Sequence, residues 1–106
     1  MPKKGLDKKG DVGLMDKQKN KVEPPKKYKV VLYNDDYTPM EFVTALLIEI
    51  FHKDAATAKA ITVHVHNKQR GIAGIYSREI AETKTHQVIS LAKAHEHPLL
   101  AAFEPE

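Results

Sequence analysis

The densest polar cluster of the chain consists of three consecutive residues with hydrogen-bond acceptors, Asn34, Asp35 and Asp36. They follow an apolar run that is typical of a strand, residues 28–33, and they precede a helix start at Thr38. Asn and Asp at such a turn often bond their own backbone, so turn formation is the simplest interpretation. Polar groups held at a strand end also form binding sites. Because Thr38 is expected to cap the helix, the acidic side chains should be free for that role.

Histidines form a second set of candidate residues. His64 and His66 are two positions apart within an expected helix, and His95 and His97 repeat that spacing near a helix end. Side chains two apart on a helix point about 200° away from each other, so neither pair would share a metal ion. We therefore predict no metal site and no cofactor. The simplest interpretation of His66 is a hydrogen-bonded side chain on a helix face.

Residues suited to catalysis are scarce. The chain has no cysteine, and its only serines, Ser77 and Ser90, fit a helix cap and a helix interior. No glycine-rich phosphate loop is present. Adjacent carboxylates such as Asp35 and Asp36 seldom face each other across a substrate. The sequence therefore predicts a protein that is not an enzyme and has no catalytic residue.

The positive charge lies at the N-terminus. Residues 1–27 contain nine lysines and four acidic residues, a net charge of +5, whereas residues 28–106 have a net charge of −2. The first segment has no aromatic residue and few large apolar ones, so we expect a flexible Lys-rich extension over residues 1–25 and one folded domain over 26–106. The acidic balance of that domain argues against nucleic acid as a partner.

The chain also lacks two features of exported or membrane proteins. No apolar run approaches the roughly 18 residues of a membrane span, and the N-terminus has no secretory signal. We therefore expect a cytoplasmic protein with no membrane partner.

The elements expected to position these residues alternate between strands and helices. Apolar periodicity and capping residues predict an α+β fold in the order β-α-α-β-α-β, with three helices covering a small three-stranded antiparallel sheet. The strands are expected at 28–33, 72–76 and 99–103, and the helices begin at caps Thr38, Asp54 and Ser77.

A long stretch of the chain resembles a known family. The run YKVVLYNDDYTPMEFV over residues 28–43 is similar to the characteristic sequence of ClpS, the adaptor of the ClpA-ClpP ATP-dependent protease. Three later stretches agree with it: residues 65–66, 79–84 and 96–100. The resemblance covers about residues 24–106. It implies an adaptor that binds proteins with a large hydrophobic N-terminal residue (Leu, Phe, Tyr or Trp; N-degrons) and delivers them to ClpA.

The resemblance also implies how the chain end would be recognised. An α-ammonium group, with a pKa near 8, carries three donors and calls for three acceptors, at least one of them anionic. Asn34, Asp36 and neutral His66 would supply these acceptors, and Asp35 would contact the adjoining backbone. An internal peptide would leave the acceptors unpaired, at a cost of about 1–3 kcal/mol each.

An apolar pocket must then hold the first side chain. Met40 and Val43 are spaced i, i+3 on the first helix, and Thr62 and Val65 repeat that spacing on the second, so both pairs can face one groove. Where the family commonly has Met, this chain has Thr62, which changes the pocket's shape. The resemblance adds further lining residues, Thr38 and Leu99.

The resemblance places Glu79 and Lys84, on the third helix, at the surface that docks the N-terminal domain of ClpA. Two other interpretations stay open. The small fold also resembles the C-terminal domain of the ribosomal stalk protein, which would make the chain a structural interaction domain without recognition of N-termini. The other open interpretation is a small hydrolase using Asp35, Asp36 and His66.

Overall fold

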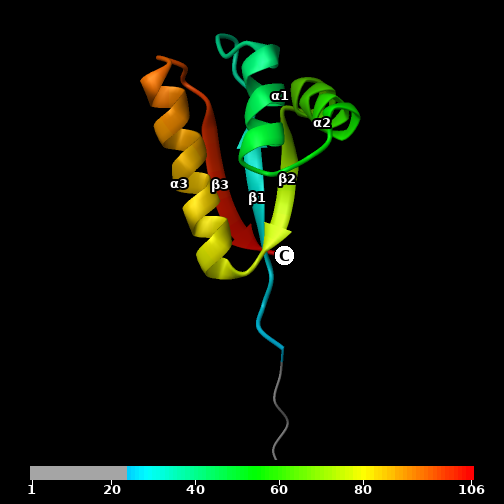
Figure 1. Cartoon of the computed structure of the whole chain (residues 1–106), viewed down its shortest axis with the longest axis vertical. Helices are drawn as coiled ribbons and strands as arrows, with labels where there is room; N and C mark the ends of the chain where they lie inside the picture. Colours follow the sequence, from blue (N-terminus) through cyan, green and yellow to red (C-terminus); the bar gives the residue numbers. More distant parts are fainter. Residues whose placement is uncertain (1–23) are drawn as a thin grey trace, which may run out of the picture.

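A computed structural model describes residues 24–106 of the chain. It confirms the predicted α+β fold: three helices and a three-stranded antiparallel sheet in the order β-α-α-β-α-β (Figure 1). The predicted Lys-rich extension lies outside the described residues except for Pro24 and Pro25. The elements are β1 (Tyr28–Tyr33), α1 (Met40–Glu49), α2 (Ala55–Lys68), β2 (Arg70–Tyr76), α3 (Arg78–Ala94) and β3 (Leu100–Pro105).

Strand β1 forms the centre of the sheet, with β2 on one side and β3 on the other. Both neighbours run antiparallel to it. The pairing with β2 shifts between Val30, which faces Gly74, and Val31, which faces Ile72. Ala73 is therefore an extra residue on β2, a bulge that bends an edge strand and increases its twist.

The core lies between the sheet and the helices. Val30 and Leu32 alternate toward it from β1, and they meet Leu46 and Leu47 of α1 and Val88 of α3. Figure 1 shows α1 and α3 lying across the sheet, with α2 beside α1. Val31, between them, is also fully buried, and this fits a central strand whose β-branched and aromatic residues predicted it from the sequence.

Two of the three predicted helix caps are confirmed. The Asp54 carboxylate accepts a hydrogen bond from the Thr57 N–H group at 2.7 Å, and the Ser77 hydroxyl accepts one from the Ile80 N–H group at 3.4 Å. Each begins its helix because it satisfies a backbone donor that has no partner within the helix.

The third predicted cap, Thr38, is wrong. Helix α1 begins at Met40 after Pro39, with no side-chain cap. Thr38 instead donates its hydroxyl to Asp35 Oδ2 at 2.8 Å, while Asp35 Oδ1 accepts from the N–H groups of Thr38 at 2.7 Å and Tyr37 at 2.8 Å. An Asp side chain readily bonds the backbone two and three residues ahead, and here that local turn takes precedence over the cap. Asp35 is therefore not free, contrary to the sequence-based expectation.

Two opposing effects act on the ionisation of Asp35. Partial burial disfavours its charged form, but hydrogen bonds from Thr38 and Tyr37, together with the charge of His97, outweigh burial and lower its pKa from the ordinary value of 3.8. A carboxylate whose pKa is lowered by folding stabilises the fold above its unfolded-state pKa. That contribution is lost as the pH falls through the folded-state pKa, which lies below 3.8.

We expect Asp35→Ala to lower the melting temperature at pH 7 by a few degrees, because the N–H groups of Tyr37 and Thr38 lose their acceptor. The difference from wild type should shrink as the pH falls below 3.8. Circular-dichroism melts across this range measure it. The matched control is Asp36→Ala, since Asp36 accepts no hydrogen bond from residues 24–106. A difference independent of pH would contradict the role of the Asp35 charge.

Candidate functional site

Separate parts of the chain meet at the end of the sheet where β1 stops. Tyr33, the last residue of β1, pairs with Arg70 at the start of β2 and with Leu100 at the start of β3. Since β2 follows α2 after one residue, the last turn of α2 also reaches this end. The loop between β1 and α1 starts there as well. The antiparallel register thus gathers segments that are far apart in the sequence.

Contacts at this junction connect Asn34 with the end of α2. The Asn34 backbone N–H donates to the Gln69 carbonyl at 2.9 Å, and its side-chain Nδ2 lies 3.5 Å from Gln69 Oε1. Gln69 Nε2 donates to the His66 carbonyl at 3.1 Å. Gln69 therefore contacts both Asn34 and the backbone of His66, two of the three residues predicted to supply acceptors.

The two acidic residues of the loop differ in what they are free to do. The Asp35 carboxylate already accepts three hydrogen bonds from its own turn. Asp36 is exposed, and among residues 24–106 nothing donates a hydrogen bond to its side chain. Within the described part of the chain, Asp36 is thus the loop carboxylate open to a cationic ligand.

The predicted pocket residues divide into buried and accessible ones. Val43, Val65 and Leu99 are all more than 90% buried and belong to the hydrophobic core. Met40, at the first position of α1, is 40% exposed. Thr38 is half-buried in the loop, where its hydroxyl is bonded to Asp35.

Thr62 is buried and its hydroxyl is fully engaged. It donates to the Ala58 carbonyl at 2.9 Å and lies 2.8 Å from the Thr44 hydroxyl across the contact between α1 and α2. A hydrogen-bonded threonine pair thus joins these two helices.

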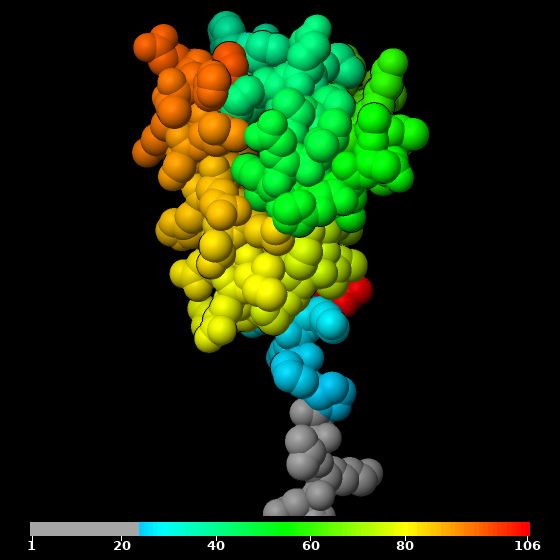
Figure 2. Space-filling model, in the orientation of Figure 1, coloured from blue at the N-terminus to red at the C-terminus, as the bar shows by residue number. Residues whose placement is uncertain are grey.

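A groove of about 510 Å³ lies along the contact between α1 and α2, which are adjacent on the face shown in Figure 2. Two predicted pocket residues, Met40 and Thr62, line it. Lys59 and Glu41 lie at its sides, and its other lining residues are Thr44, Ala45, Ile48 and Val63. Met40 and Thr62 thus lie at this groove, whereas Val43, Val65 and Leu99 belong to the core and Thr38 to the loop.

The predicted partner-docking residues lie on α3. Glu79 is exposed in the first turn, at the end of the domain opposite the loop between β1 and α1 (Figure 1). Lys84 is half-buried; its Nζ donates to the Ile50 carbonyl at 2.6 Å and lies 5.8 Å and 5.3 Å from the ring centroids of Phe51 and Tyr76. Lys84 is thus not simply a solvated side chain, because it joins α3 to the end of α1.

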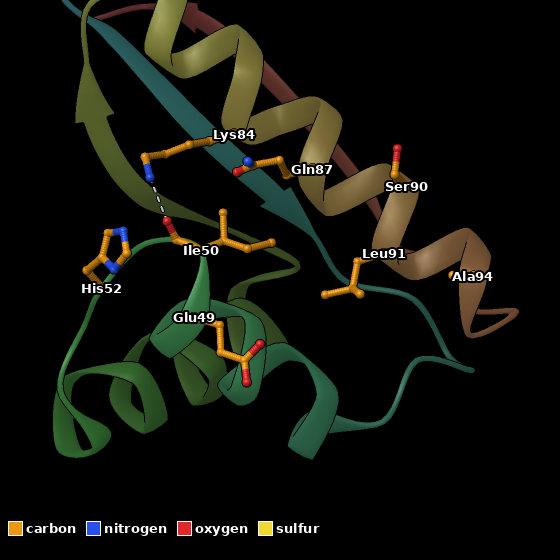
Figure 3. Close-up of a pocket in the computed structure, with 8 residues that line it drawn as sticks. All are labelled: Glu49, Ile50, His52, Lys84, Gln87, Ser90, Leu91 and Ala94. Carbon is orange, nitrogen blue, oxygen red and sulfur yellow. Dashed lines mark hydrogen bonds between the residues drawn. The ribbon is translucent and has the colours of Figure 1, made fainter.

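Lys84 lies at the edge of a second groove, of about 630 Å³, between the end of α1 and α3 (Figure 3). Its lining mixes an apolar floor with polar side chains from both helices: Glu49, Ile50, His52, Lys84, Gln87, Ser90, Leu91 and Ala94. Figure 3 shows the Lys84 amine directed toward the Ile50 carbonyl.

Sequence reasoning did not single out Gln69 or the aromatic contacts of His97. Gln69 ends α2 in the left-handed conformation, with φ of 74°, a position that usually holds Gly or Asn. His97 packs its ring 4.7 Å from that of Phe42, and His95 lies 5.4 Å from the same ring. Nothing in the local pattern around Gln69 indicated its contact with Asn34, because the two residues are 35 positions apart.

Residues 24–106 contain no group of three or more His, Asp or Glu side chains placed to hold a metal ion. No helix in this range is long and apolar enough to cross a bilayer.

The chain is similar to known proteins over most of its length. A family model described as ATP-dependent Clp protease adaptor protein ClpS matches residues 23–102. The ClpS adapter proteins of Paraburkholderia xenovorans (strain LB400) and Burkholderia mallei (strain SAVP1) are each 46% identical over 96 residues, covering 91% of this chain and 92% of theirs.

A solved structure matches as well. That of Agrobacterium tumefaciens ClpS2 bound to L-phenylalaninamide has a TM-score of 0.76 and 40% identity, and the match covers 78% of this chain and all of that one. With the family model spanning most of the sequence and relatives aligning along nearly their whole length, the chain belongs to the ClpS family of ATP-dependent Clp protease adaptor proteins.

Proposed function

We propose that this adaptor binds proteins whose N-terminal residue is large and hydrophobic and delivers them to a ClpA-type unfoldase. The observation that carries the proposal is the similarity to a ClpS2 structure bound to L-phenylalaninamide. That compound has a free α-amine, an aromatic side chain and an amide in place of the carboxylate. It therefore has the chemical groups of the first residue of a protein chain.

The junction at the end of β1 offers acceptors suited to an α-ammonium group. Asp36 supplies an exposed carboxylate, Asn34 an amide oxygen and His66 a ring nitrogen when neutral. An ammonium that donates to all three exchanges its hydration for charge-assisted hydrogen bonds. An acetylated or internal amine has at most one donor and no charge, so it would not satisfy the set.

The apolar residues next to this junction would hold the first side chain. Met40 is the accessible member, while Val43, Val65 and Leu99 form the buried wall behind it. Burying a Leu or Phe side chain against them is worth roughly 1.5–3 kcal/mol. Beyond Met40 and Thr62, the groove between α1 and α2 gives room for contacts that depend on side-chain size.

Delivery requires that the adaptor hold its substrate and the unfoldase together. Glu79 lies in the first turn of α3, at the opposite end of the domain from the β1–α1 loop, so the two partners would not compete for one surface (Figure 1).

Proteins of this adaptor family are not enzymes, in agreement with the sequence-based prediction. Family membership also favours this function over a ribosomal-stalk-like domain. An ATP-driven partner fits the expected cytoplasmic location.

Asp36→Ala is expected to weaken binding of a Phe-initiated peptide about 10- to 150-fold, because a charge-assisted hydrogen bond contributes about 1.5–3 kcal/mol. Fluorescence anisotropy with a labelled peptide measures this. The same peptide acetylated at its α-amine serves as the control and should not bind the wild-type protein. Equal affinity of wild type and variant, at unchanged melting temperature, would rule Asp36 out of the site.

Thr62→Met should change the order of affinities for peptides that differ in their first residue. A longer side chain reduces the space between α1 and α2, so a Trp-initiated peptide is expected to lose about tenfold in affinity relative to a Leu-initiated one. Thr62→Val, which keeps the shape but removes the hydroxyl, is the matched control and should keep the wild-type ranking. An unaltered Trp-to-Leu ratio in Thr62→Met would show that position 62 does not line the pocket.

Glu79→Lys should separate delivery from recognition. Peptide affinity is expected to stay at the wild-type value, while degradation of a Phe-initiated reporter by ClpA-ClpP should fall at least several-fold. Glu79 is the better position to alter because removing Lys84 also deletes its bond to the Ile50 carbonyl. Degradation at the wild-type rate would remove Glu79 from the docking surface.

A further inference from the structure

Gln69 is held in an unfavourable backbone conformation. Its φ of 74° and ψ of −9° are left-handed, where a side chain is disfavoured and Gly is the usual residue. Its carbonyl accepts from the Asn34 N–H at 2.9 Å, a bond that any residue could make. Any advantage of Gln over Gly at this position must therefore come from the contacts of the Gln69 side chain.

That side chain bonds in two directions. Its Nε2 donates to the His66 carbonyl at 3.1 Å, and its Oε1 faces Asn34 Nδ2 at 3.5 Å, a long hydrogen bond. The Gln69 amide thus bridges the backbone of one predicted ammonium acceptor and the side chain of another.

The chemistry of these groups fixes which way each amide points. A backbone carbonyl can only accept, so Gln69 must present its nitrogen to His66. Only its oxygen is then left for Asn34, and an oxygen can only accept. Asn34 must therefore present Nδ2 to Gln69, which leaves its own Oδ1 directed elsewhere as an acceptor. Without this chain of contacts the Asn34 amide could rotate and offer a donor in place of its oxygen.

We propose that Gln69 is a positioning residue for recognition of the chain end: it fixes the orientation of the Asn34 amide so that Oδ1, and not Nδ2, is available to the α-ammonium group. The inference rests on the proposed function, since it assigns Gln69 to the same ammonium site. An Nδ2 group turned toward the ammonium would place donor against donor. Orientation of this amide is therefore a requirement for binding, separate from fold stability.

Two neutral substitutions separate positioning from stability. Gln69→Gly removes the amide but suits the left-handed backbone, so its melting temperature should stay near or above the wild-type value. Gln69→Met keeps the length and the backbone strain but also lacks the amide. If Gln69 orients Asn34, both variants should bind a Phe-initiated peptide about three- to tenfold more weakly than wild type, the range expected for one hydrogen bond.

A double-mutant cycle with Asn34→Ala tests whether the effect passes through Asn34. In that background, adding Gln69→Gly should cause no further loss of affinity, because the group that it orients is absent. An equal loss in both backgrounds would overturn the proposal, and so would wild-type affinity in Gln69→Gly and Gln69→Met. If the wild-type protein itself failed to bind the Phe-initiated peptide, the proposed function would fall, an outcome distinct from wild-type binding that Gln69 does not affect.

Discussion

The antiparallel register between β1 and β2 is the constraint on which the candidate site depends. It places Tyr33 opposite Arg70, and the next residue along, Asn34, continues the ladder with a hydrogen bond to the Gln69 carbonyl. A slip of one residue would move the acceptors of the loop away from the end of α2 and turn the core side chains of β1 outward. The same pairing that buries Val30 and Leu32 therefore also sets the geometry of the candidate site.

In the loop after β1, the neighbouring carboxylates Asp35 and Asp36 have different surroundings. Asp35 accepts three hydrogen bonds from its own turn, and these hold its pKa below the ordinary value despite partial burial. Asp36, next to it, remains exposed. A carboxylate that is fully engaged stiffens the loop, so a ligand that bound its neighbour would cause a smaller loss of conformational entropy. The two neighbouring carboxylates thus differ: Asp35 is bonded within the loop and partly buried, whereas Asp36 is exposed.

Lys84, on α3, is a predicted docking residue that also makes contacts within the fold. Its amine bonds the Ile50 carbonyl at the end of α1 and lies near the rings of Phe51 and Tyr76. Burial also raises the pKa of Tyr76. A cation held between aromatic rings and a carbonyl fixes how α3 packs against the α1–α2 connection. A surface on α3 that docked a partner would therefore be rigidly joined to the helix that carries Met40.

Local chemistry in the sequence determined the elements and the types of group available. An apolar run rich in β-branched and aromatic residues predicted β1, the caps Asp54 and Ser77 predicted where α2 and α3 begin, and the resemblance over residues 28–43 indicated the family. Tertiary structure decided the rest. The loop itself decided between two local hydrogen bonds of Thr38: its hydroxyl bonds the charged Asp35 carboxylate and does not cap α1, a choice that composition alone does not rank. The place of Gln69 beside Asn34 depended on strand register, because that contact joins residues 35 positions apart.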